Sequence, residues 1–254
     1  MATDHATEDK RPATTVDAVD KSESRVRRMF GEIAGRYDFL NHFLSLNVDH
    51  YWRWRAVRHT PPVGDDPILD ICTGTGDLAL AYYKRTPQGL PIVASDFCPE
   101  MLAIGRKKGE RAGAGERITW VEADSQSLPF PSDRFQIVSV AFGLRNVTST
   151  TAGLAEMTRV CRPGGHVVVL EFSMPRRQPI RALYGWYFRH VLPRLGQLLS
   201  RNREEAYNYL PQSVGQFPQG EALCDMMRDA GLVEVIHRPL TFGVATLYVG
   251  KKPT

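Results

Sequence analysis

The chain has 254 residues, 43% hydrophobic and 24% charged with a net charge of +4, which is typical of a globular protein holding one α/β domain. No apolar stretch approaches the roughly 20 residues of a membrane-spanning helix, and the first residues lack the apolar segment of a secretory signal. The cysteines are scattered without Cys-x-x-Cys spacing, which argues against a disulfide framework or a metal site.

The chain begins with a polar segment and a helical lead-in. Residues 1–24 hold almost no large apolar side chain and are expected to form a disordered tail. Apolar residues then recur at helical spacing from Arg25, and residues 35–38 are expected to break this first helix. A short apolar segment at 39–46 and a third helix at 50–57 follow. This aromatic lead-in either closes over a substrate or packs on a sheet.

A glycine-rich loop organises the rest of the sequence. An apolar run ends in Asp70, turns through Gly74-Thr75-Gly76 and continues as an apolar helix. This pattern predicts the strand, tight loop and helix that open a nucleotide-binding α/β domain. The two glycines would let the backbone approach a ligand closely. Taken alone, the loop also fits the dinucleotide fingerprint.

Acidic residues near this loop indicate the ligand. Asp77 ends the loop, Asp96 follows the apolar run at 90–95, and Asp124 follows a third run. Asp96 lies twenty residues after Gly76, where a carboxylate holds a ribose diol. Several carboxylates would repel a pyrophosphate but suit a ligand that carries a sulfonium and an ammonium. This favours S-adenosylmethionine over a nicotinamide cofactor, while a helix cap remains open for Asp77.

Strand and helix patterns alternate through the remaining chain. Helical patterns at 99–108 and 151–161 alternate with apolar runs at 136–142 and 166–172. The alternation predicts an α/β fold with a Rossmann-like, doubly wound, mostly parallel sheet, in one domain over residues 25–254. A helical insertion rich in arginine and aromatic residues is expected at about 174–217. A helix at 220–230 and strands at 233–237 and 244–251 close the domain.

Together these motifs resemble the class I methyltransferases, and within them the quinone C-methyltransferases of ubiquinone and menaquinone biosynthesis. The resemblance runs from about Val26 to Lys252 and is carried by Tyr37-Asp38-x-x-Asn41, Leu69-Asp70, Gly74-Thr75-Gly76-Asp77, Leu128-Pro129-Phe130, Phe142-Gly143-Leu144-Arg145-Asn146-Val147, Arg162-Pro163-Gly164-Gly165, Leu170-Glu171-Phe172-Ser173 and Tyr207-x-Tyr209-Leu210. The Gly-Leu-Arg-Asn and Leu-Glu-Phe-Ser strings separate this family from other methyltransferases. It implies transfer of a methyl group from S-adenosylmethionine to a ring carbon of a prenylated hydroquinone.

The resemblance also implies a set of cofactor-binding residues. Asp96 would hold the ribose and Asp124-Ser125 would flank the adenine. The full set is Asp70, Gly74, Thr75, Gly76, Asp96, Asp124, Ser125 and Ala141. Three of these depart from the family pattern, because Asp124-Ser125 stands where Asn-Ala is usual and Ala141 where serine is often found. Asp124 can still accept a hydrogen bond from the adenine amino group, whereas Ala141 offers only its backbone.

Methylation of a ring carbon is easiest when a hydroquinone hydroxyl is ionised, and a phenol has an ordinary pKa of about 10. Arg145 is expected to stabilise the phenolate electrostatically, since a guanidinium is a poor proton acceptor. Asn146 would orient the ring oxygen or a water, and Tyr37 would complete the hydrogen bonding. The alternatives are a structural salt bridge for Arg145 and a helix cap for Asn146.

Other functions and partners stay open at this point. A nicotinamide oxidoreductase would share the loop, but no Tyr-x-x-x-Lys pair follows. Another small-molecule methyltransferase, or one acting on nucleic acid, is also open; the arginines of the insertion are interleaved with apolar residues, so no nucleic-acid partner is expected. Residues 180–192 are typical of a segment lying on an anionic membrane, or their aromatics line the quinone pocket. We expect a cytoplasmic protein at the inner face of the membrane and leave a homodimer open.

Overall fold

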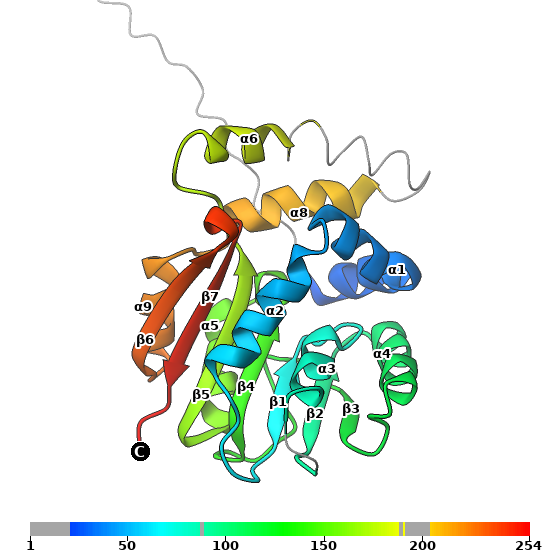
Figure 1. Cartoon of the computed structure of the whole chain (residues 1–254), viewed down its shortest axis with the longest axis vertical. Coiled ribbons are helices and arrows are strands. Elements are labelled where there is room, and N and C mark those ends of the chain that lie inside the picture. The colour runs from blue at the N-terminus through cyan, green and yellow to red at the C-terminus, as the bar shows by residue number, and fades with distance from the viewer. Residues whose placement is uncertain (1–20, 87–88, 188–189, 191–203) are drawn as a thin grey trace, which may run out of the picture.

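The computed structural model describes residues 21–86, 89–187, 190 and 204–254, and its centre is a seven-stranded sheet (Figure 1). The strands are β1 Ile68–Ile71, β2 Ile92–Asp96, β3 Ile118–Glu122, β4 Phe135–Ala141, β5 Cys161–Phe172, β6 Val233–Leu240 and β7 Ala245–Lys251. Their order is β3-β2-β1-β4-β5-β7-β6. Pairing is parallel from β3 to β5, whereas β7 runs antiparallel to β5 and β6. The predicted mostly parallel, doubly wound sheet is confirmed.

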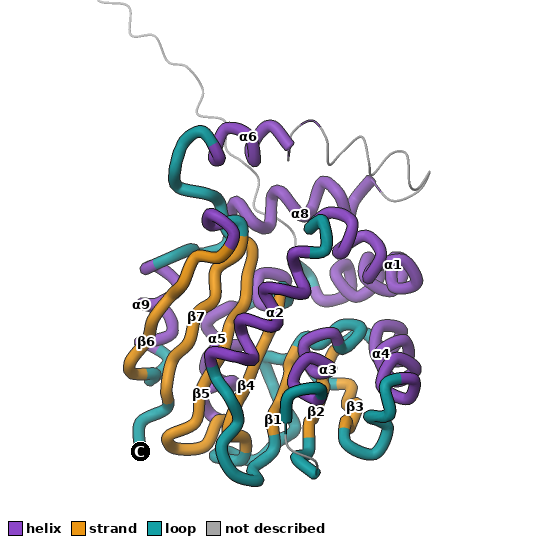
Figure 2. The backbone as a smooth tube through the Cα atoms, in the orientation of Figure 1, coloured by secondary structure: helices purple, strands orange, loops and turns teal. Residues whose placement is uncertain are grey.

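Helices cover both faces of this sheet (Figure 2). They are α2 Val48–His59, α3 Asp77–Tyr83 and α4 Pro99–Arg111 on one face, and α5 Thr150–Val160 and α9 Glu221–Asp229 on the other. Successive strand residues point to opposite faces, so Ile68 packs with Trp52 of α2 while Leu69 packs with Leu154 of α5. The predicted run in β4 is nearly continuous in apolar residues because both of its faces are covered.

Trp120 in β3 holds α4 and the glycine loop close to the sheet. A Cβ atom added to Gly76 would lie 2.3 Å from its indole ring, and one added to Gly105 of α4 would lie 2.4 Å away. Gly76 also has a φ of 83°, a conformation that side chains disfavour. Gly76 is therefore required by packing against Trp120, and its predicted role toward a ligand stays a prediction.

The lead-in differs from the expectation. Helix α1 runs without interruption over Glu23–Leu44, so the predicted break at residues 35–38 and the separate segment at 39–46 are wrong. Gly35 costs the helix only about 1 kcal/mol of propensity, and the packing of Ala34 on Met101 of α4 offsets that cost. The helix starts two residues before the expected Arg25. Residues 1–20 lie outside the described residues, so the disordered tail stays a prediction.

The insertion supplies α6 Ile180–Trp186 and α8 Glu204–Gln216, and residues 191–203 between them lie outside the described part of the chain. With α1, these helices gather above the carboxyl ends of the strands (Figure 1). Two short 3-10 turns, η1 Leu144–Asn146 and η3 Thr241–Gly243, follow β4 and β6. Among the described residues, no helix is both long and apolar enough to cross a membrane. The enclosed edge of the sheet is where a ligand site is expected in this fold.

Candidate cofactor and methyl-transfer site

The loop at residues 73–76 leaves β1 and is tied to the neighbouring strand β2. The amide of Thr73 donates to the carbonyl of Ser95 at 2.9 Å, and the amide of Gly74 donates to Asp96 Oδ2 at 2.8 Å. Asp70 braces the loop from behind, since it accepts hydrogen bonds from the hydroxyls of Thr73 and Ser139. Asp70 is 1% exposed, and this burial raises its pKa to about 7.

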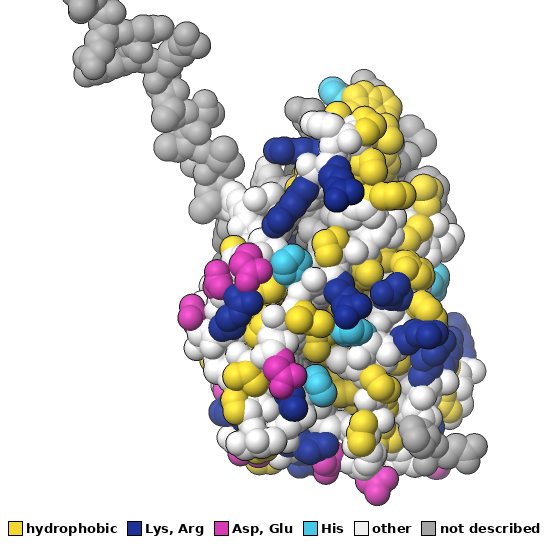
Figure 3. All heavy atoms as spheres, turned by 60° about the vertical axis from the view of Figure 1, so that its left-hand side comes forward, with side chains coloured by type: hydrophobic (Ala, Val, Ile, Leu, Met, Phe, Trp, Pro, Cys, Tyr) yellow, Lys and Arg dark blue, Asp and Glu magenta, His cyan; other side chains and the backbone are white. Residues whose placement is uncertain are grey.

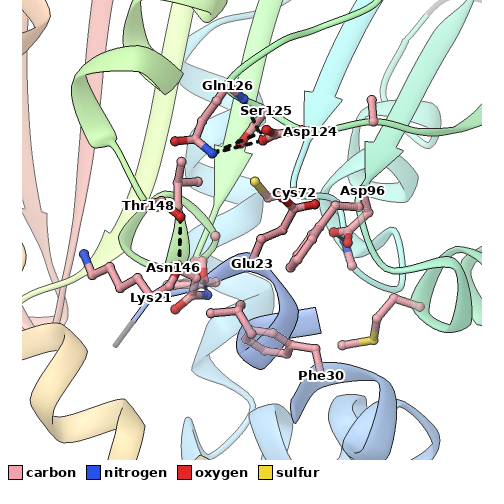
Figure 4. A pocket seen from close by; sticks show the side chains of 18 residues that line it. Lys21, Glu23, Phe30, Cys72, Asp96, Asp124, Ser125, Gln126, Asn146 and Thr148 are labelled. Atoms are coloured by element: carbon pink, nitrogen blue, oxygen red, sulfur yellow. Dashed lines mark hydrogen bonds between the residues drawn. The ribbon is translucent and has the colours of Figure 1, made fainter. Parts of the chain in front are cut away.

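A cavity opens on one side of this loop, beneath the N-terminal half of α1 (Figure 4). Four of the predicted cofactor residues line it, namely Gly74, Asp96, Asp124 and Ser125. Asn146, predicted as catalytic, lines the same cavity from the turn after β4. The end of β2, the end of β3 and the turn after β4 thus meet around one space, as the carboxyl ends of parallel strands do.

Asp96 combines burial with spare capacity for hydrogen bonds. Its two carboxylate oxygens accept from the amides of Gly74 and Cys98, at 2.8 and 2.9 Å. Burial raises the pKa of Asp96 to about 6, although these hydrogen bonds act in the opposite direction. A carboxylate has about four acceptor positions, so Asp96 keeps room for a ribose diol.

Asp124 and Ser125 form a preformed turn at the cavity wall. Asp124 Oδ1 accepts from the backbone amide of Gln126 at 2.9 Å, and Ser125 lies within hydrogen-bonding reach of Cys72. The departure from the usual Asn-Ala pair therefore leaves both side chains engaged with neighbours of this chain. Burial raises the pKa of the Cys72 thiol well above its ordinary value, so this thiol is not a nucleophile at neutral pH.

A smaller cavity lies on the other side of the glycine loop. Its lining includes the remaining predicted residues Asp70, Thr75 and Ala141, together with Arg53 of α2. Cys72, Gly74 and Phe142 line both cavities, so the two adjoin across the loop. A ligand that touches all the predicted residues except Gly76, which lines neither cavity, must therefore span the loop.

A charge network holds this second side of the loop. Asp77 pairs with Arg53 at 3.3 Å and with Lys108 of α4, and these two cations hold its pKa below the ordinary value although burial raises it. Lys108 also pairs with Asp38 of α1 at 2.7 Å, and the Thr75 hydroxyl donates to Asp38. Gly76 occupies the cap position of α3, so Asp77 acts through ion pairs and not as the cap.

The network continues to the junction of α1 and α2. Asp49 is 2% exposed and pairs with Arg53, while it accepts hydrogen bonds from Ser45 at 2.6 Å and from His42 Nδ1 at 2.7 Å. Burial raises its pKa, but these partners outweigh burial and lower the pKa of Asp49 to about 2. His42 also stacks on His50 at 4.4 Å between ring centroids, so packing accounts for both histidines.

Arg145 is buried and paired with Glu171 of β5. Its Nη1 lies 3.0 Å from Glu171 Oε2, and its backbone amide donates to Glu171 Oε1 at 3.2 Å. Nη1 also donates to the carbonyl of Phe142, and the guanidinium carbon lies 5.3 Å from the Phe172 ring centroid. The salt bridge weighed as an alternative role is present. The Nε atom of Arg145 has no hydrogen-bond partner among the described residues.

Asn146 leaves a polar atom unsatisfied in the cavity region. Its Oδ1 is buried and has no hydrogen-bond partner in the described part of the chain, while Nδ2 lies 3.5 Å from the carbonyl of Phe142. The cap of α5 is Ser149, whose hydroxyl accepts from Ala152, so Asn146 does not cap that helix. Buried polar atoms without a partner are rare in proteins, and one on a residue that lines a cavity is a candidate contact for a ligand. Tyr37 lies in α1, but its side chain is outside the described residues.

Comparison with known proteins decides the family. The ubiE/COQ5 methyltransferase family matches residues 18–252. The chain belongs to this family. The "Ubiquinone/menaquinone biosynthesis C-methyltransferase UbiE" of Geobacter sulfurreducens is 44% identical over 95% of this chain and 93% of its own length. The "Demethylmenaquinone methyltransferase" of Thermus thermophilus is 48% identical over 89% of this chain and 100% of its own.

Solved structures share the fold of this methyltransferase. A SAM-dependent methyltransferase from Thermotoga maritima superposes with a TM-score of 0.63 at 18% identity, covering 89% of this chain and 99% of that one. A phosphoethanolamine N-methyltransferase from Haemonchus contortus in complex with S-adenosyl-L-methionine has a TM-score of 0.59 at 14% identity, over 80% and 52% of the two chains. The Haemonchus contortus structure holds S-adenosyl-L-methionine, the cofactor that the acids around the glycine loop predict for this chain.

The sequence interpretation missed the residues that α1 and its approach bring to the cavity. Lys21 and Glu23 line it from a segment assigned to the tail, and Val26 and Phe30 line it from α1. The helical spacing of Val26 and Phe30 predicted the helix but not which of its faces meets the cofactor site. The lead-in therefore covers a ligand cavity with its first turns and packs on α4 with later ones.

Proposed function

We propose that this enzyme transfers the methyl group of S-adenosylmethionine to a ring carbon of a prenylated hydroquinone, the chemistry that the names of its relatives describe for those proteins. The observation that carries the proposal is the cavity with Asp96 at one end and Asn146 at the other, beside the buried Arg145–Glu171 pair. The Asn146 oxygen has no partner among the residues that the structure describes. The cofactor, when bound, supplies an electrophilic methyl group on a sulfonium.

The residues around the loop fit this cofactor. Asp96 accepts hydrogen bonds from the ribose hydroxyls with the acceptor positions that Gly74 and Cys98 leave free. Asp124 and Ser125 hold the adenine at the cavity wall. The other assigned residues, Asp70, Thr75, Gly76 and Ala141, shape the loop and the smaller cavity beside it.

The acceptor ring lies at the Asn146 end of the cavity. Arg145 stabilises the phenolate electrostatically from the same turn that carries Asn146. Glu171 holds the guanidinium in place and balances its charge while the site is empty. Asn146 orients the ring oxygen, and Tyr37 is assigned to complete the hydrogen bonds. Positioning of the ring carbon in line with the methyl group accounts for the rest of the rate.

A biochemical assay tests the reaction. Purified enzyme with S-adenosylmethionine and either a prenylated naphthohydroquinone or a prenylated benzohydroquinone should give a product heavier by one methylene, detected by mass spectrometry. The two substrates separate the two classes that the relatives' names cover. Absence of product from both, with the cofactor bound, contradicts the proposed function and favours another small-molecule methyltransferase.

We also infer that the enzyme collects this water-insoluble substrate at an anionic membrane surface through α6. None of the residues of α6 is buried; Leu183 is 66% and Trp186 52% exposed, and Arg181 is exposed beside them. Tyr184 and Tyr187 are only partly exposed, so the aromatic residues of this segment divide between an outer and an inner face. Figure 3 shows arginine and hydrophobic side chains together at this end of the molecule, as interfacial helices require.

Flotation with anionic vesicles tests this docking. Binding should fall with added salt and with Arg181→Glu, and also with Arg189→Glu, whose position lies outside the described residues. Arg106→Glu on the exposed side of α4 is the matched control and should bind as the unmodified chain does. A chain that stays in the soluble fraction at low salt, whatever the lipid charge, contradicts membrane docking. The expected cytoplasmic location, the homodimer and the absence of a nucleic-acid partner stay predictions.

A further inference from the structure

Lys21 lies at the acceptor end of the cofactor cavity, just before α1. Its carbonyl accepts a hydrogen bond from the Thr148 hydroxyl at 2.9 Å, which ties this residue to the loop after β4. Lys21 lines the cavity with Asn146, and Figure 4 shows its side chain next to Asn146 and extending away from Asp96. Among the described residues, its ammonium has no hydrogen bond or ion pair.

The surroundings of Lys21 favour its uncharged form. Burial is the largest influence and lowers its pKa; the carboxylate of Glu171 raises the pKa and the guanidinium of Arg145 lowers it. The net result is a pKa below the ordinary value of 10.5. Glu171 comes from β5 and Arg145 from the turn after β4. Glu23, the first residue of α1, lines the same cavity. A lowered pKa increases the share of the free amine, which is the form of a lysine that can act as a general base.

The proposed reaction needs such a base. A hydroquinone hydroxyl must lose its proton before the ring carbon becomes strongly nucleophilic. Arg145 cannot accept that proton, because a guanidinium keeps its own proton at any physiological pH. Glu171 is already paired with Arg145 and has no exposed surface to offer, being 1% exposed. An amide such as Asn146 is no base. Two titratable side chains line the cavity from the start of the described chain. Figure 4 shows Glu23 toward Cys72 and Lys21 next to Asn146, so Lys21 is the one at the acceptor end.

We propose that Lys21 is the catalytic base that takes the proton from the ring hydroxyl of the acceptor, an inference that rests on the proposed function. The amine of Lys21 accepts the hydroxyl proton, leaving an ammonium and a phenolate. The ring carbon forms a bond to the methyl group as the methyl–sulfur bond breaks and the sulfonium becomes a neutral thioether. The methylated carbon then loses its hydrogen to water as a proton, and the Lys21 ammonium returns its proton to the ring oxygen.

Charges balance in this cycle. With Lys21 uncharged, the Arg145–Glu171 pair is neutral overall, so proton transfer creates one ammonium and one phenolate side by side. The new ammonium lies in the field of Glu171, and Arg145 remains available to the phenolate. The two residues therefore have separate roles: Lys21 accepts and returns the proton, and Arg145 stabilises the negative charge of the phenolate.

Two variants of Lys21 test the assignment, with Lys107→Gln on the exposed side of α4 as the matched control. Lys21→Gln should bind S-adenosylmethionine within twofold of the unmodified enzyme by calorimetry, which also reports a folded site. Its kcat at pH 7 should fall at least about 100-fold, the usual size of a general-base effect. Its kcat should then rise about tenfold per pH unit until the hydroquinone ionises by itself. Lys21→Arg should resemble Lys21→Gln, because it restores charge but not basicity.

A spectroscopic measurement gives a readout independent of turnover. A hydroquinone analogue bound without cofactor should show phenolate absorbance with the unmodified enzyme and with Lys107→Gln, but not with Lys21→Gln. Two results would overturn the assignment while leaving the proposed function intact. One is turnover by Lys21→Arg equal to that of the unmodified enzyme, and the other is a pH profile of Lys21→Gln that runs parallel to the profile of the unmodified enzyme. An unmodified enzyme that methylates no prenylated hydroquinone overturns both.

Discussion

The two sides of the glycine loop differ in whether their polar side chains find partners within the chain. On the side that faces α2 and α4, here called the outer side, Asp77, Arg53 and Lys108 are all engaged in ion pairs within the chain. With Asp49 they form the outer network. On the side with the cavity beneath α1, here called the cavity side, the Asn146 oxygen lacks a partner among the described residues. Asp96 there keeps free acceptor positions. Buried polar groups that are fully paired stabilise a fold, whereas buried groups with capacity left over indicate a ligand.

The pKa values of one acid from each side, Asp49 and Asp96, are shifted in opposite directions. Asp49 of the outer network has its pKa lowered from 3.8 to about 2, so its contribution to the free energy of unfolding is present above pH 3.8 and lost as the pH falls toward 2. Asp96 has its pKa raised from 3.8 to about 6, so the folded chain binds this proton more tightly than the unfolded one. The contribution of Asp96 to the free energy of unfolding therefore falls as the pH rises from 3.8 to about 6.

Asp49→Ala should have the largest effect, because it leaves Arg53 buried with one partner fewer. We expect the free energy of unfolding to fall by about 3 kcal/mol in urea denaturation, and the difference from the unmodified chain to vanish as the pH drops toward 2. Asp229→Ala at the exposed end of α9 is the control. A loss below about 1 kcal/mol would mean that the outer network contributes little to stability.

Arg145→Lys probes the cavity side at its catalytic end. An ammonium is a point charge and does not reproduce the planar set of donors of a guanidinium, whose Nη1 bonds to both Glu171 and the Phe142 carbonyl. We expect kcat to fall at least about 100-fold while cofactor affinity changes less than about threefold. Arg159→Lys, which alters a paired arginine on α5, is the matched control. Near-normal turnover would assign Arg145 to structure alone.

Asp96→Ala probes the cofactor end of the same cavity. Loss of a charged acceptor should weaken S-adenosylmethionine binding at least about tenfold in calorimetry, a cost of roughly 1.5–3 kcal/mol. For the unmodified enzyme, affinity should also decline as the pH falls through about 6, where Asp96 takes up a proton. The variant should show no such decline. Unchanged affinity in Asp96→Ala would remove this residue from the site.

Thr75→Val should have the smallest effect and decides on which side Thr75 belongs. The resemblance assigned Thr75 to the cofactor, yet its hydroxyl donates to Asp38 and accepts from Lys108 at 3.2 Å. We expect the free energy of unfolding to fall by about 1 kcal/mol and cofactor affinity to change less than about threefold. A tenfold loss of affinity with unchanged stability would show instead that the hydroxyl serves the ligand.

The sequence by itself determined the elements whose signal is local. Apolar runs predicted β1, β4 and the parallel sheet, because burial on both faces leaves a nearly continuous apolar pattern. The spacing from Gly76 to Asp96 predicted the carboxylate at the cofactor cavity, because two adjacent parallel strands end at the same edge.

Only the tertiary structure decided which distant residues meet. Helix α1 continues through Gly35 because it packs on α4, a contact that local propensity does not record. Arg145 meets Glu171, and Asp77 meets Arg53 and Lys108, because the strand order brings separate loops and helices together. Lys21 reaches the cavity for the same reason. Periodicity reports which face of an element is buried, but the partner of that face is set by how the whole chain packs.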